Sequence, residues 1–273
     1  KEGKICEKLR LTQDCSQQRA SGFSLNTFSA DEVDRPDLNV DCYFGGCLNR
    51  LLLRILLLRF RHPNTPILLS KHDLDSAYRR MHIKLDHALL ECWTWHDYIV
   101  FNSRMPFGGK PCAKKFSNMT DIVCDLSQWI INDPSWEPAS LQSSIGEIPQ
   151  PSEYEFGTKA EARQLLDGID CEQIYVDAYI DDFATIVAAT ESSLILKAQH
   201  AVPLALDTLF RPIHKEDSSH LVRSQLLAPD KMLEEGFLSE IKTILGVTVD
   251  TVKMCISLPV NKAKRYMIEV RQL

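Results

Sequence analysis

Two adjacent carboxylates, Asp181 and Asp182, stand between two apolar runs of β-prone residues, 174–180 and 183–187. This pattern predicts a hairpin that carries both acids at its tip. Like charges so close together repel each other unless a cation neutralises them, so the tip is predicted to attract positive charge. Taken alone, the pair is weak evidence, because a polar Asp-Asp turn between two strands is common.

A third carboxylate, Asp73, follows the apolar run that begins at residue 66, which predicts a buried strand over 66–74. If that strand lies beside the hairpin, three carboxylates offer the hard oxygen ligands that Mg²⁺ prefers and leave coordination positions for phosphates. Two such ions about 4 Å apart can activate a primer 3′-hydroxyl and stabilise the leaving pyrophosphate. The residues therefore predict a nucleotidyl transferase whose catalytic groups are Asp73, Asp181 and Asp182.

Apolar periodicity predicts the elements that precede the hairpin. A helix is predicted over 47–60, and alternating residues in 89–95 and 98–104 predict a second hairpin. Apolar residues at helical spacing predict a helix over 111–132, with Pro111 at its first position. The order strand, helix, hairpin, helix, strand predicts an α+β fold with a split βαβ antiparallel sheet and helices on one face. Such a sheet brings Asp73 beside the Asp-Asp tip.

The remainder of the chain continues this pattern. We expect a helix from Thr190 to about Phe210 with a kink at Pro203, and a last hairpin formed by 243–249 and 255–258. A final helix is expected to begin at Pro259.

The charge distribution allows a nucleic-acid partner although the net charge is −6. Residues 50–80 contain seven basic and two acidic side chains, whereas 133–172 contain nine acidic and two basic ones. Phosphate contacts are made by Lys and Arg, so the basic segment is the candidate contact region. Each of these basic residues can equally be a solvated surface charge.

The cysteines and the apolar segments limit other classes of function. Nine cysteines are an odd number, and none are spaced like the ligands of a zinc knuckle; Cys42 and Cys47 are interpreted as ordinary thiols. The most apolar stretch, 51–60, is about half of a membrane span and contains Arg54 and Arg59. With no leader-like segment at the start, we expect an intracellular protein without a membrane partner, in either cytoplasm or nucleus.

Three motifs in a fixed order resemble those of reverse transcriptases. Residues 73–78 (Asp-Leu-Asp-Ser-Ala-Tyr) resemble the first catalytic motif, 105–108 (Met-Pro-Phe-Gly) the substrate-pocket motif and 179–182 (Tyr-Ile-Asp-Asp) the tyrosine-x-Asp-Asp box. Residues 245–247 and 256–259 are similar to the later sheet and primer-gripping region, so the resemblance covers about 50–265. It is closest to retroelement enzymes of the gypsy-like or tyrosine-recombinase type, which carry Phe rather than Gln at the position of Phe107.

The resemblance implies an RNA-directed DNA polymerase made of the fingers and palm of a right-hand fold, with the thumb largely absent. It implies two Mg²⁺ ions, with Mn²⁺ as a substitute, held by Asp73, Asp181, Asp182 and the Leu74 carbonyl. It also implies a deoxynucleotide pocket in which the Tyr78 ring excludes a ribose 2′-hydroxyl. The residues implied to bind substrate are Ser76, Ala77, Tyr78, Phe107, Gly108 and Lys110. A lysine is implied as general acid for pyrophosphate, and Lys231 and Lys242 are both candidates.

The implied partners are an RNA or DNA template with its primer and a deoxynucleoside triphosphate. Adjoining thumb, ribonuclease H and integrase or recombinase domains are further partners that the resemblance implies. The implied organisation is a poorly defined polar segment at 1–46, fingers and the first part of the palm at 47–132, an acidic Pro-rich insertion at 133–172, palm at 173–258 and the start of a thumb at 259–273.

Two other functions stay open. The chain can be an inactive, transposon-derived remnant that binds nucleic acid, in which case it binds template-primer without adding nucleotides. It can also be an RNA-templated RNA polymerase with the same metal chemistry, although the bulk of Tyr78 disfavours ribonucleotides. The ring of Tyr78 can also be explained by packing against a sheet.

Overall fold

The computed structural model describes residues 43–90, 92–109, 112–136, 173–210 and 235–271, together with the single positions 15, 16, 24, 26 and 227. The chain divides into two compact units, one of residues 1–42 and 76–118 and the other of residues 43–75 and 119–273. Among the described helices, none is long and apolar enough to cross a membrane.

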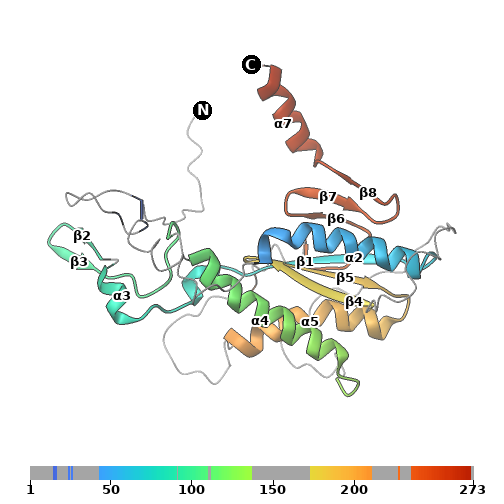
Figure 1. Ribbon diagram of the computed structural model, residues 1–273, viewed down its shortest axis with the longest axis horizontal. Helices are drawn as coiled ribbons and strands as arrows, with labels where there is room; N and C mark the ends of the chain where they lie inside the picture. The colour runs from blue at the N-terminus through green and yellow to red at the C-terminus, as the bar shows by residue number, and fades with distance from the viewer. Residues whose placement is uncertain are drawn as a thin grey trace. The chain divides into compact units, whose positions relative to one another are not determined.

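The larger unit contains a three-stranded antiparallel sheet with the strand order β1-β5-β4 (Figure 1). Its strands are β1 (Ile67–Asp73), β4 (Ile174–Tyr179) and β5 (Asp182–Ala188). The apolar runs that predicted these strands are buried in the structure, and β4 and β5 form the predicted hairpin. The prediction that the Asp73 strand lies beside this hairpin is confirmed, because β1 pairs with β5 along its whole length.

A helix lies on each face of this sheet, which differs from the expectation of helices on one face. Helix α2 (Cys47–Arg61), preceded by the short η2 (Tyr43–Gly46), packs through its apolar stripe against alternate residues of β1 and β5. Helix α5 (Ser192–Phe210), which contains Pro203, covers the opposite face (Figure 1). The reason is visible in β5, where residues 183–188 are all buried; a strand that is apolar on both sides must be covered on both.

Helix α4 (Cys112–Asn132) agrees with its predicted bounds within one residue. Val123, Ser127 and Ile130 are buried at helical spacing, and the side-chain amide of Gln128 donates a hydrogen bond of 3.2 Å to the Ile174 carbonyl of β4. This contact joins the later half of α4 to the sheet of the larger unit.

A second antiparallel sheet contains β6 (Ile241–Ile244), β7 (Val247–Asp250) and β8 (Cys255–Ser257). The predicted hairpin forms between β7 and β8, but the predicted first strand, 243–249, is divided by a turn into β6 and β7. Leu245 and Gly246 both have positive φ angles of 48° and 83°, which reverses the chain between β6 and β7. Helix α7 (Val260–Arg271) follows, and none of its residues is buried.

The smaller unit contains η3 (Ala77–Arg80), α3 (Leu85–Leu90) and a hairpin of β2 (Trp93–Trp95) and β3 (Tyr98–Val100). The predicted hairpin forms around the expected turn, where His96 has a φ of 53°. Its first strand is shorter than predicted because residues 89 and 90 end a helix. Apart from positions 15, 16, 24, 26 and 43–46, the predicted N-terminal segment lies outside the described residues, as do residues 137–172 of the acidic insertion, Lys110 and Lys231.

Candidate metal and nucleotide site

The ends of β1 and β5 place two of the predicted metal ligands directly opposite each other. Asp73, the last residue of β1, pairs with Asp182, the first residue of β5. Side chains at directly opposed positions of antiparallel strands point to the same face, with their β-carbons about 5 Å apart. The two carboxylates therefore share one face at one end of the sheet, although more than a hundred residues separate them in sequence.

The third acid, Asp181, lies in the turn between β4 and β5. Tyr179 pairs with Asp182, so Ile180 and Asp181 form a two-residue connection. The backbone N–H of Leu74 donates a hydrogen bond of 3.1 Å to the Asp181 carbonyl, which ties this turn to the residue after Asp73. Ile180 has a φ of 58°, a conformation that β-branched residues rarely adopt. The backbones of the three predicted metal ligands thus lie near one another at one end of the sheet, and the side chain of Leu74 is buried.

A lysine ammonium lies against this edge. Lys71 Nζ is 3.2 Å from Asp182 Oδ1 and 3.1 Å from Glu235 Oε2. Burial alone would lower the pKa of Lys71, but the carboxylates of Asp182 and Glu235 outweigh that effect and raise the pKa above its ordinary value. The sequence analysis did not single out Lys71, although a lysine two residues before Asp73 on a strand must share its face.

The described residues contain no group of three or more His, Cys, Asp or Glu side chains close enough together to hold a metal ion. The donors at the strand ends are nonetheless carboxylate oxygens, the type that Mg²⁺ prefers. One of these carboxylates, Asp182, already binds the ammonium of Lys71. The electrostatic environment at this end of the strands therefore favours a positive charge.

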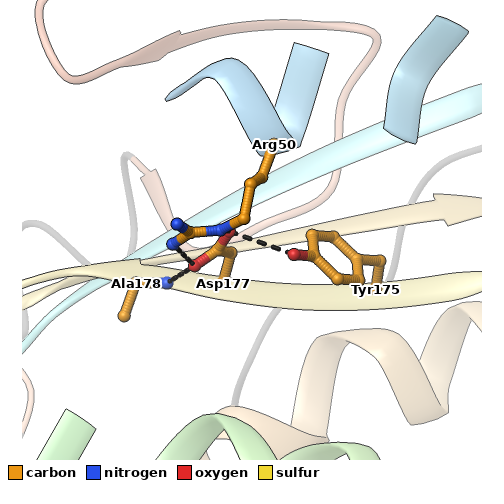
Figure 2. A network of polar contacts seen from close by, with 4 residues as sticks. All are labelled: Arg50, Tyr175, Asp177 and Ala178. Carbon is orange, nitrogen blue, oxygen red and sulfur yellow. Dashed lines mark hydrogen bonds and ion pairs between the residues drawn. The ribbon is translucent and has the colours of Figure 1, made fainter. Parts of the chain in front are cut away.

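Four residues before Asp181, Asp177 joins β4 to α2 through a charged network (Figure 2). The sequence analysis did not predict this network. Arg50 donates through Nε and Nη2 to the two carboxylate oxygens of Asp177, each at 2.7 Å. The same carboxylate accepts from the Tyr175 hydroxyl at 3.1 Å and from the Ala178 backbone N–H at 2.8 Å. Asp177 is thus satisfied by four donors. A lone acid inside the apolar run 174–180 is the sequence signal that could have predicted such a partner.

The network perturbs its neighbours in a consistent direction. Burial, with a contribution from the Asp177 charge, raises the pKa of Tyr175 to about 12 and that of the Cys47 thiol to about 12. The Arg54 guanidinium lies 4.7 Å from the centre of the Tyr175 ring, in a cation–π contact. Tyr175 and Cys47 are therefore neutral at ordinary pH.

Two arginines of α2 that were candidates for phosphate contact bind groups of the protein itself. Arg50 is bound to Asp177, and Arg59 donates to the carbonyls of Pro63, Thr65 and Thr251 at 3.0, 2.8 and 3.3 Å. Both guanidiniums act in holding the larger unit together. The interpretation of these two residues as structural is favoured over phosphate contact.

Lys242, one of the two candidates for the general acid, is buried on β6. Its ammonium donates to the carbonyls of Glu235 and Phe237 at 3.1 and 2.7 Å. Burial lowers its pKa to about 8, and the nearby Glu235 charge offsets only part of that effect. Lys242 therefore binds the backbone of Glu235, whose side-chain carboxylate pairs with Lys71.

The smaller unit brings two of the predicted substrate residues into contact. The rings of Tyr78 and Phe107 lie 5.0 Å apart between centroids, and Tyr78 meets the buried Phe116 edge-on at 5.3 Å. Ala77, the first residue of η3, is buried, whereas Ser76 is exposed and has a φ of 55°. The Tyr78 ring is half-buried, which is compatible with both packing and a substrate-facing role.

Gly108 is one of the positions where glycine is required by the backbone. Its φ of 106° lies outside the range that residues with a β-carbon normally adopt. Its carbonyl accepts a hydrogen bond of 3.0 Å from the side-chain amide of Asn26. At Gly109 a β-carbon would lie 2.6 Å from the Cys112 sulfur, so this glycine permits close packing at the start of α4.

No family model matches the chain, and no curated protein matches it. Among solved structures, it is similar to the foamy viral protease-reverse transcriptase dRH in complex with ds DNA, with 15% identity and a TM-score of 0.43. The similarity covers 77% of this chain and 25% of that one, so the chain spans about a quarter of that protein's length. A likeness this weak does not assign the chain to a family.

Proposed function

We propose that this chain is the fingers and palm of a reverse transcriptase from a retroelement, and that it extends a primer with deoxynucleotides on an RNA or DNA template. The observation that carries the proposal is the pairing of Asp73 with Asp182 at the strand ends, with Asp181 tied to Leu74 beside them. The predicted catalytic carboxylates come from two distant motifs, and the sheet brings their backbones to one edge.

In the proposed site, Asp73, Asp181, Asp182 and the Leu74 carbonyl would hold two Mg²⁺ ions. When bound, these ions supply the positive charge that lowers the pKa of the primer hydroxyl and stabilises the leaving pyrophosphate. The β1–β5 ladder and the hydrogen bond from the Leu74 backbone N–H to the Asp181 carbonyl support this assignment, because they bring the backbones of these residues to one end of the sheet. The Tyr78 ring, supported by Phe107 and Phe116, would select the sugar.

A primer-extension assay tests the proposal. The chain is incubated with an RNA template, a DNA primer, deoxynucleotides and Mg²⁺, and addition of the first nucleotide is measured. Asp181→Asn is expected to lose about a thousandfold in rate, because several kcal/mol of charge stabilisation are removed. Asp125→Asn is the matched control, since this carboxylate is exposed on α4. Equal incorporation by wild type and Asp181→Asn would reject the metal-ligand assignment.

The same assay separates the two alternatives. A chain that binds template-primer in a salt-dependent way but adds no nucleotide, even when a thumb is supplied, is a nucleic-acid-binding remnant. A chain that adds ribonucleotides as readily as deoxynucleotides is an RNA polymerase.

A further inference from the structure

Lys71 reaches one of the proposed metal ligands from the neighbouring strand. Lys71 and Asp73 are two residues apart on β1 and therefore point to the same face as Asp182. The register pairs Lys71 with Ala184, so Asp182 is its diagonal neighbour, at a spacing that a long side chain can cross. The Lys71 ammonium forms an ion pair with Asp182, with 3.2 Å between Nζ and Oδ1.

Glu235 gives the same ammonium a second acidic partner. Its Oε2 lies 3.1 Å from Lys71 Nζ, and the side chain of Lys71 is only 12% exposed. The Glu235 backbone is held in place by Lys242, which donates to its carbonyl at 3.1 Å. The Glu235 carboxylate therefore gives Lys71 a second partner, so Lys71 can leave Asp182 without being left uncompensated in a largely buried position.

We infer that Lys71 is a resident counter-cation of Asp182, which a divalent ion must displace, and that Glu235 holds the ammonium once it is displaced. The inference rests on the proposed function, since it takes Asp182 as a metal ligand. An ammonium and a divalent cation at the same carboxylate repel each other, so they compete for Asp182. Lys71 thus weakens metal binding and balances the paired carboxylates before the metal arrives, whereas Glu235 favours metal binding by drawing Lys71 away.

The test is Mn²⁺ binding by the full chain without nucleic acid, measured by calorimetry and by electron paramagnetic resonance. Lys71→Met is expected to bind Mn²⁺ about tenfold more tightly than wild type, a coupling of ordinary size. Glu235→Gln is expected to bind about threefold more weakly, because Lys71 then has Asp182 as its remaining partner of the two. The double variant is expected to match Lys71→Met, since Glu235 acts through Lys71. Lys253→Met is the control, because it removes the same charge from a lysine that is 76% exposed and pairs with Asp250.

Two results would overturn the inference. One is an Mn²⁺ affinity of Lys71→Met that is unchanged, weaker, or raised no more than that of Lys253→Met. The other is a Glu235→Gln variant that binds Mn²⁺ as tightly as wild type. This second variant tests the inference even if Lys71→Met does not fold. Asp181→Asn distinguishes this failure from failure of the proposed function. If wild type binds Mn²⁺ and Asp181→Asn does not, only the role of Lys71 is rejected; if Asp181→Asn binds as wild type does, or wild type does not bind, the metal site and the inference are both rejected.

Discussion

Arg50 of α2 binds both carboxylate oxygens of Asp177 on β4, with two hydrogen bonds of 2.7 Å. Bidentate pairs of this kind fix direction as well as distance, because the guanidinium fork and the carboxylate are both planar. Asp177 lies four residues before Asp181 on the strand that leads into the turn. The pair therefore fixes the position of β4 against α2 close to the proposed catalytic tip.

Replacement of Arg50 by Met is expected to destabilise the chain by about 2 to 3 kcal/mol, because it leaves the buried Asp177 charge without its cation. The value is below that of a fully buried pair, since the Arg50 side chain is 35% exposed. Urea unfolding measures the change. The double variant Arg50→Met with Asp177→Asn should recover part of the loss. A loss below about 0.5 kcal/mol, the range of ordinary surface substitutions, would contradict the structural role of the pair.

Asp73→Asn removes one of the two directly opposed carboxylates of the proposed metal site. The change is expected to abolish primer extension and to reduce the stabilisation that Mg²⁺ confers. Thermal unfolding with and without Mg²⁺ measures the stability effect. Asp125→Asn, on the exposed side of α4, should change neither. Retention of the full Mg²⁺ effect in Asp73→Asn would show that this residue is not a ligand.

Asp207, in the last turn of α5, gives a pH-dependent prediction. Burial raises its pKa from 3.8 to about 6, so the folded chain holds the proton more tightly than the unfolded chain. Stability from this group is therefore present at low pH and is lost as the pH rises from about 4 to about 6. A carboxylate near a helix C-terminus is also unfavourable to the helix dipole.

Asp207→Asn should accordingly be more stable than wild type by about 1 kcal/mol at pH 7, a figure reduced for partial exposure of the carboxyl. The difference should vanish below the ordinary pKa of 3.8, where Asp207 is protonated in both the folded and the unfolded chain. Urea unfolding across this pH range measures it, with Asp125→Asn as the exposed control. A difference that stays constant with pH would show that the titration of Asp207 is not responsible.

Tyr78→Val is expected to admit ribonucleotides, because a smaller side chain leaves room for a 2′-hydroxyl. Steric discrimination of this kind is worth about 1 to 3 kcal/mol, so the preference for deoxynucleotides should fall by about 10- to 200-fold. Competitive incorporation of the two sugars measures the ratio. Tyr78→Phe keeps the ring contacts with Phe107 and Phe116 and should retain the preference. An unchanged ratio in Tyr78→Val would leave packing as the role of this ring.

The sequence by itself predicted the local elements near the proposed site. The bounds of β1, β4, β5 and α4 agree with the predictions because the strands are short apolar runs and α4 carries apolar residues at helical spacing. The approach of Asp73 to the Asp-Asp turn was also predicted, since it follows from the order of strands and helix. The turn within 243–249 was missed because two positive φ angles, at Leu245 and Gly246, interrupt a run that alternates like one strand.

Only the tertiary structure decided which charges meet. Arg50 and Asp177 are 127 residues apart, and Lys71 and Glu235 are 164 apart by their numbers. Periodicity shows which face of an element a side chain occupies, but the partner across that face depends on strand register and helix placement. Long-range ion pairs form only when packing brings two elements together. The pairs Lys71–Asp182 and Arg50–Asp177 could therefore not be predicted from local sequence.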